Sequence, residues 1–133
     1  MAGTGPQDDI RAVLDQLLQA QNAGDAQGVR SRLSESPDAV HIGTDADEWW
    51  TSTQIVDALA AAGGADEIQA VADDVNVHVQ GDVAWVEGRG RFTTAGGGER
   101  PVRMTGVFVR EDGQWKAVQS HASIGVPNDE IFG

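Results

Sequence analysis

The spacing of apolar residues changes near the middle of the chain from a helical period to a strand period. In the first part, apolar residues follow the i, i+3, i+4, i+7, i+8 spacing of an amphipathic helix: Ile10, Val13, Leu14, Leu17 and Leu18. From Ile68 onward the period is two, and alternate valines mark one face of a long strand. The pattern predicts helices first and long antiparallel strands second, which is an α+β arrangement.

Three helices are expected before the strands. Gly24 stops the first helix, and Asp25 directly after it caps a short second helix that Pro37 ends. A short apolar strand over residues 39–42 follows. Thr51 and Gln54 have the spacing of a capping box and start the third helix.

The third helix is predicted to end at Gly63 and Gly64. A loop that carries acidic residues and two tryptophans lies between the short strand and this helix: Asp45, Asp47, Glu48, Trp49 and Trp50.

Two tight turns predict how the long strands pair. Gly81 and Asp82 form a two-residue turn that aligns His78 opposite Trp85, and Asp73 interrupts the apolar face of the first strand at a bulge or bend.

The third long strand, residues 102–110, returns through Asp112 and Gly113 into the fourth, residues 114–123. This second turn predicts three cross-strand pairs: Phe108 with Ala117, Gly106 with Gln119, and Met104 with His121.

The last strand carries an unusual mixture of side chains on one predicted face. Alternation puts five residues there: Trp115, Ala117, Gln119, His121 and Ser123. Buried polar groups need partners, so this face is typical of a pocket lining rather than of a dry core. A structural histidine bonded to a backbone carbonyl is the alternative. Periodicity does not decide which sheet face the helices cover.

Composition bounds the remaining possibilities. A chain of 133 residues suits a single domain, residues 1–133, with an ordered core over about residues 8–128. It has no cysteine, hence neither disulfides nor a thiolate metal site. The net charge of −12 argues against nucleic acid and anionic membranes as partners. No secretory or membrane-spanning segment is visible, so a soluble cytoplasmic protein is expected.

Two stretches, residues 42–50 and residues 121–128, together with the element order, resemble the SnoaL-like branch of the nuclear transport factor 2-like, or ketosteroid isomerase-like, superfamily. The resemblance implies a cone-shaped fold. In it a strongly curved antiparallel or mixed sheet and three helices enclose a cavity, usually in a homodimer that associates through the sheet. Members include ketosteroid isomerases, polyketide cyclases, dehydratases, epoxide hydrolases and noncatalytic association domains, and the fold does not choose among them.

The resemblance also suggests which residues line the cavity. The sheet contributes Met104, Phe108, Gln119 and His121, with Ser123 on the same predicted face. The loop before the third helix contributes Trp49 and Trp50 near the mouth or floor. One of these indoles is expected to be a core anchor instead.

Proton transfer is the chemistry that the residue types favour. No metal site is expected, since the three histidines are far apart in sequence, and no nucleophile motif or cofactor motif is present. His121 is the candidate general acid or base, with Asp45 or Glu48 orienting it; the alternative is that these carboxylates form a solvated loop. The chain has no tyrosine, which excludes a copy of the ketosteroid isomerase mechanism, with its phenolic donor.

The sequence therefore favours a protein with a largely apolar cavity that binds a hydrophobic small molecule. Any catalysis would be a cofactor-free isomerisation, cyclisation or dehydration that uses His121. The alternative is a noncatalytic dimerisation or association module. A third interpretation, binding of a cationic partner, depends only on the acidic charge, which solubility also explains.

Overall fold

The computed structural model describes residues 5–62 and 68–133 of the chain. The elements follow in this order: α1 (Pro6–Ala23), α2 (Ala26–Arg30), β1 (Val40–Ile42), β2 (Trp49–Trp50), α3 (Ser52–Ala62), β3 (Ile68–Gln80), β4 (Val83–Thr94), β5 (Glu99–Glu111), β6 (Gln114–Ser123) and α4 (Asn128–Phe132). The strands form one sheet in the order β2-β1-β6-β5-β4-β3. β1 and β6 are parallel, and the other neighbours are antiparallel.

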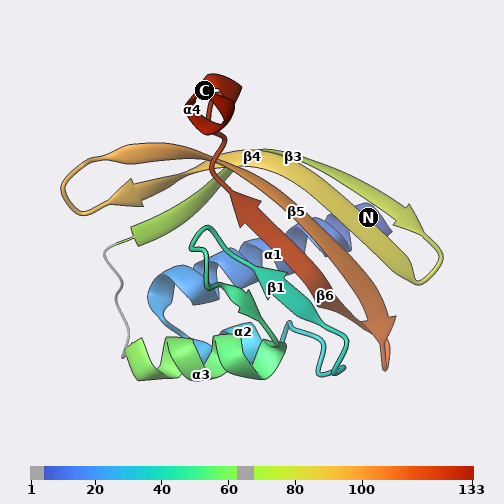
Figure 1. Cartoon of the computed structure of the whole chain (residues 1–133). Coiled ribbons are helices and arrows are strands. Elements are labelled where there is room, and N and C mark those ends of the chain that lie inside the picture. Colours follow the sequence, from blue (N-terminus) through green and yellow to red (C-terminus); the bar gives the residue numbers. More distant parts are fainter. Residues whose placement is uncertain (1–4, 63–67) are drawn as a thin grey trace.

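The sheet is curved, and its long strands arch over α1, α2 and α3 (Figure 1). The α4 helix lies on the other side of the sheet. The predicted α+β class with a curved mixed sheet is confirmed. The described residues contain four helices rather than three, because the C-terminal tail adds α4.

The helix ends follow the predicted local chemistry. Gly24 caps α1 in the left-handed region with φ 71°, and the Asp25 side chain accepts a hydrogen bond from the Gly28 amide at 3.0 Å. Thr51 and Gln54 form the reciprocal capping box that starts α3. The predicted end at Gly63 and Gly64 falls outside the described residues. α2 ends at Arg30, earlier than predicted, and the two-residue strand β2 was not predicted.

The first hairpin has the predicted register. His78 pairs with Trp85, and the pairing of β3 with β4 shifts between Ala72 and Asp74, which confirms a bulge at Asp73. The next strand, β5, is longer than predicted at both ends.

A second bulge, in β6, changes the predicted register of the last hairpin. Phe108 pairs with Ala117 as predicted, but Val107 then pairs with Gln119, so Val118 is an extra residue in β6. The predicted pairs of Gly106 with Gln119 and of Met104 with His121 are wrong. The observed partners are Ser120 for Gly106 and Ala122 for Met104.

The bulge also turns each later β6 side chain to the opposite face. We call the face that α1, α2 and α3 cover the concave face; it carries Phe108 and Ala117, which are 2% and 3% exposed. The convex face carries Val107 and Gln119. The core fills the space between the concave face and the first two helices: Ile10, Val13, Ala20, Val29, Leu33, Ala84, Val86, Phe108, Trp115 and Ala117.

Candidate functional site

Three polar side chains meet on the concave side of the sheet. The imidazole of His41 in β1 lies between the hydroxyls of Ser120 in β6 and Ser52 at the start of α3. Its Nδ1 is 2.7 Å from the Ser120 Oγ, and its Nε2 is 3.1 Å from the Ser52 Oγ. We call these three residues the His41 cluster.

Three separate local features assemble the His41 cluster. β1 pairs with β6 in parallel, and this pairing puts His41 beside Ser120. The bulge at Val118 turns Ser120 toward the helices, and the capping box at Thr51 fixes where α3 begins and therefore where Ser52 stands.

Burial keeps the His41 ring neutral. The residue is only 3% exposed, and desolvation lowers the pKa of His41 below its ordinary value of 6.5. The ring is therefore uncharged at pH 7. The positive N-terminal end of α3 at Ser52 also favours the uncharged ring.

The two distances indicate how the ring hydrogen is placed. A separation of 2.7 Å suits donation by the Ser120 hydroxyl to an unprotonated Nδ1, and 3.1 Å suits donation by Nε2–H to the Ser52 oxygen. In this assignment His41 presents a basic nitrogen to Ser120. Ser120 is half-buried, whereas His41 is buried, so Ser120 is the member of the cluster that a bound molecule reaches first. The cluster can pass a proton from Ser120 to the imidazole and back.

The structure divides the predicted site residues between the two sheet faces. Gln119, His121 and Ser123 follow the bulge and lie on the convex face, where Gln119 and His121 are exposed. Trp49 also lies there and is 69% exposed. The predicted shared face of Trp115, Ala117 and these β6 residues is therefore wrong, because the bulge interrupts the alternation.

Three of the predicted lining residues do lie on the concave face. Phe108 is buried in the core, whereas Met104 is half-buried, and the half-buried Trp50 pairs with His41 across β1 and β2. Asp45 stays within its own loop, where its side chain accepts a hydrogen bond from the Asp47 amide at 3.0 Å. Among the described residues, Asp45 makes no hydrogen bond or ion pair with His121.

Sequence reasoning missed His41 as a site residue. The available signal was a histidine in the middle of a short apolar strand, with Val40 and Ile42 beside it. Its partners are 11 and 79 residues away in sequence, so the contacts depend on the sheet order and not on any local motif.

Two grooves lie on the outside of the molecule, away from the His41 cluster. One, of about 470 Å³, lies between α2 and the β5–β6 hairpin and is mainly polar, with Arg30, Glu35, Glu111 and Lys116 in its wall. The other, of about 170 Å³, lies between α1 and β3. The described residues contain no group of metal-ligating side chains and no helix long and apolar enough to cross a membrane.

Comparison with known proteins identifies the family. Residues 10–127 match the SnoaL-like domain. The chain belongs to the SnoaL-like family. This agrees with the helix order and the curved mixed sheet of the nuclear transport factor 2-like superfamily. We found no match among curated proteins.

Solved structures support the same fold. A nuclear transport factor 2-like protein of unknown function from Pseudomonas putida KT2440 has a TM-score of 0.82 and 17% identity over 98% of this SnoaL-like chain and 94% of that chain. A proposed dehydratase of the same superfamily from Streptomyces avermitilis has a TM-score of 0.72 and 21% identity, over 91% of this chain and 96% of that chain. A proposed calcium/calmodulin dependent protein kinase II association domain from Xanthomonas campestris has a TM-score of 0.74 and 22% identity, over 92% of this chain and 89% of that chain. At these identities the likeness shows the fold alone.

Proposed function

We propose that this SnoaL-like protein binds an apolar small molecule on the concave side of its sheet and transfers a proton with Ser120 and His41, without a cofactor. The observation that carries the proposal is the Ser120 hydroxyl, half-buried and 2.7 Å from the Nδ1 of a buried neutral imidazole. Functional sites are where burial and specific partners perturb a titratable group in this way.

The surroundings of the His41 cluster support an apolar ligand. Trp50 pairs with His41 and is half-buried, and the half-buried Met104 lies two residues from Gly106, the β5 partner of Ser120. Ile55 and Leu59 on α3, the helix that Ser52 begins, are half-buried and pack against the core. Small-molecule sites combine such a lining with a few well-placed polar groups. The proposal moves the proton-transfer role from His121, which is exposed on the convex face, to His41.

The hydrogen bonds indicate an order of proton movements. Ser120 Oγ accepts a proton from the substrate, for example from a carbon next to a carbonyl, as its own proton passes to Nδ1 of His41. Nε2–H, already bonded to Ser52, holds the charged ring in place. Return of the proton to another carbon completes an isomerisation. Its return to a hydroxyl that leaves as water completes a dehydration, and its return to the oxygen of a carbonyl that the new carbanion has attacked completes a cyclisation.

A model proton abstraction tests this proposal. The probe is nitrobenzisoxazole: a base removes its C–H proton, the N–O bond breaks, and a coloured cyanophenolate forms. We expect His41→Gln and Ser120→Ala to lower kcat/KM by about 10²-fold or more. His121→Gln, on the convex face, is the matched control and leaves the rate unchanged. Equal rates for His41→Gln and the unsubstituted protein would contradict the proposal, as would a folded protein no faster than free imidazole.

A second candidate function is a noncatalytic association module. It is favoured by exposed apolar side chains at two separate places on the convex face: Val83 and Trp85 on β4, which are 41% and 40% exposed, and Trp49 on the edge strand β2, which is 69% exposed. Exposed apolar side chains are common at protein interfaces. A protein that self-associates but neither binds nor turns over apolar probes would support this candidate.

A further inference from the structure

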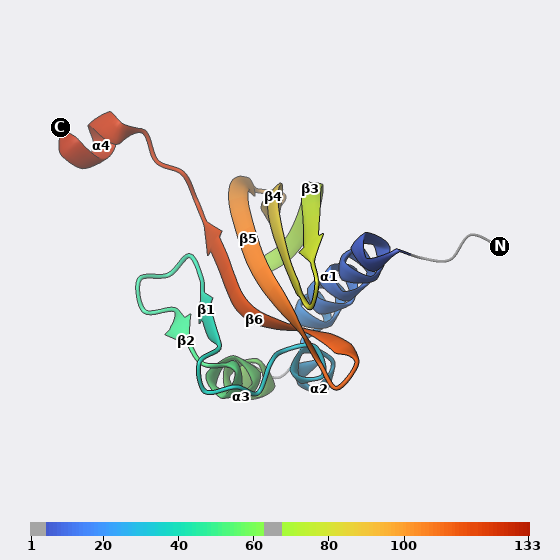
Figure 2. The same ribbon diagram turned by 90° about the vertical axis from the view of Figure 1, so that its right-hand side faces the viewer.

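Three glycines lie on the concave face of the neighbouring strands β4 and β5, which bend around the helices (Figure 2). They are Gly88 and Gly90 in β4 and Gly106 in β5. A glycine inside a strand lowers stability, because it has no side chain to pack and loses more chain entropy on folding than any other residue. Each of the three positions therefore needs a physical reason.

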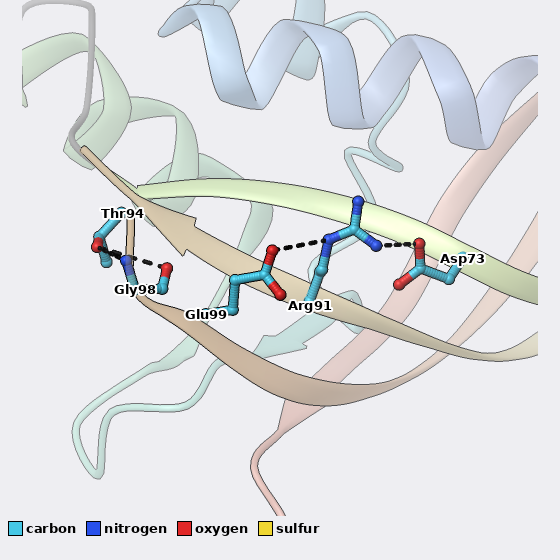
Figure 3. Close-up of polar contacts among 5 residues, drawn as sticks. All are labelled: Asp73, Arg91, Thr94, Gly98 and Glu99. Atoms are coloured by element: carbon cyan, nitrogen blue, oxygen red, sulfur yellow. Dashed lines mark hydrogen bonds and ion pairs between the residues drawn. The ribbon is translucent and has the colours of Figure 1, made fainter. Parts of the chain in front are cut away.

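The close approach of β3 explains the two glycines of β4. An added Cβ would lie 2.1 Å from a backbone oxygen of β3 at Gly90 and 2.9 Å from another at Gly88. Both contacts lie beside the β3 bulge, where the carboxylate of Asp73 forms an ion pair with the guanidinium of Arg91 in β4 (Figure 3). This ion pair links the bulge to β4, so a larger residue at either glycine would have to move β3.

No described residue requires a glycine at position 106. The three nearest atoms to an added Cβ would be the Val86 Cγ2 at 3.4 Å, the Gln119 backbone oxygen at 3.6 Å and the Phe108 Cε1 at 3.6 Å. These are ordinary van der Waals distances, so even the bulge in β6 leaves room for a methyl group. The φ angle of Gly106 also lies outside the positive range that favours glycine. A strand glycine without a reason in the fold is typical of a place where a ligand approaches the backbone.

Gly106 lies beside the Ser120 hydroxyl and at the edge of the core. It pairs with Ser120 across β5 and β6. Along β5, Phe108 on one side of Gly106 is 2% exposed, whereas Met104 on the other side is half-buried. Along β6, Ala117 is 3% exposed and Ser120 is half-buried. Burial on the concave face therefore decreases at the row that carries Gly106 and Ser120.

The missing side chain leaves room for a flat group against the backbone of β5. Neighbouring strands are about 4.8 Å apart, so a ring on Gly106 brings its substituents within reach of the Ser120 Oγ. The ring edge of Phe108 borders the same space, because its Cε1 would contact the added Cβ. Aromatic edges carry partial positive charge and favour the face of another π system. A planar conjugated ring meets both conditions, whereas the axial hydrogens of a saturated ring hold it away from the backbone.

We propose that Gly106 determines which substrates reach Ser120. It admits a planar conjugated ring that bears the reacting carbon, and it disfavours a saturated ring of the same size. The inference rests on the proposed proton transfer, because Ser120 defines where the reacting carbon lies. Since the glycine costs stability, a methyl group at position 106 strengthens the fold and weakens substrate binding.

The variant Gly106→Ala separates this role from a structural one. We expect Tm to rise by about 2–4 °C, because alanine replaces a strand glycine without crowding its neighbours. We expect KM for nitrobenzisoxazole to rise about tenfold, with a smaller change in kcat. Gly96→Ala, in the turn between β4 and β5, is the matched control and leaves KM unchanged. A fall in Tm would show that the fold needs the glycine, and an unchanged KM would show that no substrate lies on it; either result would overturn the proposal.

A binding measurement tests the preference for a flat ring without any turnover. The chain has two methionines, Met1 and Met104, and Met104 lies on the same face as Gly106, two residues away. NMR of protein labelled with methyl-13C-methionine follows the Met104 methyl group, which Met104→Leu assigns. The probes are acetophenone and cyclohexyl methyl ketone, which carry the same acetyl group on a flat and on a puckered six-membered ring. We expect acetophenone to have a dissociation constant about tenfold lower, and Gly106→Ala to remove most of this preference.

The outcomes distinguish this inference from the proposed function. Turnover that depends on His41, together with equal binding of the two ketones, would overturn the role of Gly106 alone. A Met104 signal that neither ketone shifts would overturn it as well. A preference for acetophenone that Gly106→Ala removes, in a protein without turnover, would contradict proton transfer and support Gly106 as the residue that selects the ligand.

Discussion

Replacing Ser120 by alanine tests whether the His41 cluster is a satisfied buried network. The substitution removes the hydroxyl 2.7 Å from Nδ1 and leaves that nitrogen without a partner in a residue that is 3% exposed. An unpaired buried polar group costs about 1–3 kcal/mol. For a chain of this length, 1 kcal/mol corresponds to about 3–4 °C in Tm, so we expect Tm to fall by about 3–12 °C.

Urea unfolding at pH 7 measures the loss in the free energy of unfolding. Ser123→Ala is the matched control. Ser123 stands on the same strand, and its side chain forms no hydrogen bond with any described residue, so its replacement changes stability by less than about 0.5 kcal/mol. In a His41→Leu background, Ser120→Ala costs less, because the nitrogen that would lose its partner is gone. Equal losses for Ser120→Ala and Ser123→Ala, or the same loss with and without the imidazole, would refute the reasoning.

Three further predictions concern stability. Because the folded-state pKa of His41 lies below the unfolded value, its contribution to stability is present above about pH 6.5 and is lost as pH falls toward the folded-state pKa. Urea unfolding at several pH values should show that the free energy of unfolding falls in this range, and His41→Gln should remove this dependence on pH. Gly90→Ala prevents normal folding, because an added Cβ would lie 2.1 Å from a backbone oxygen of β3. Gly96→Ala is tolerated, because an added Cβ there would point into open space. Circular dichroism should show a folded spectrum for Gly96→Ala only. Asn22→Ala lowers the free energy of unfolding by about 1–2 kcal/mol in urea, because the Asn22 amide bonds both the N–H and the C=O of Ala70 at the sheet edge; no loss would contradict this role.

The parts of the fold set by neighbouring residues could be predicted from the sequence. Asp25 and the pair Thr51 and Gln54 identify helix starts through side chains that reach nearby amides. Gly81, with φ 61°, allows the tight turn that fixes the register of the first hairpin.

The bulge at Val118 could not be predicted from the local sequence. Valine suits either face of a strand, and no glycine or proline marks the position. Phe108 pairs with Ala117, and the pairing of β6 with both β5 and β1 resumes at Gln119. Val118 is the extra residue between these two paired segments. That residue decides which face His121 occupies, so the predicted common face of Ala117 and His121 was wrong from this step onward.

The His41 cluster depends on long-range pairing, which alternation alone does not reveal. Ser120 and His121 are neighbours in β6 and therefore lie on opposite faces, and the bulge puts Ser120 on the face that the helices cover. His41 was noted only as one of three distant histidines, because the parallel pairing of a three-residue strand leaves no sequence signature.

The most direct test of the central claim uses a protein with His41 as its single histidine. The chain has three histidines, so His78→Gln with His121→Gln leaves only the buried one. The measurement is the pH dependence of kcat/KM for nitrobenzisoxazole in this variant. We predict the same plateau as in the unsubstituted protein and a rise with pH whose midpoint lies below 6.5, because burial lowers the pKa of His41. Loss of turnover in this variant, or its persistence after His41→Gln is added, would contradict the account.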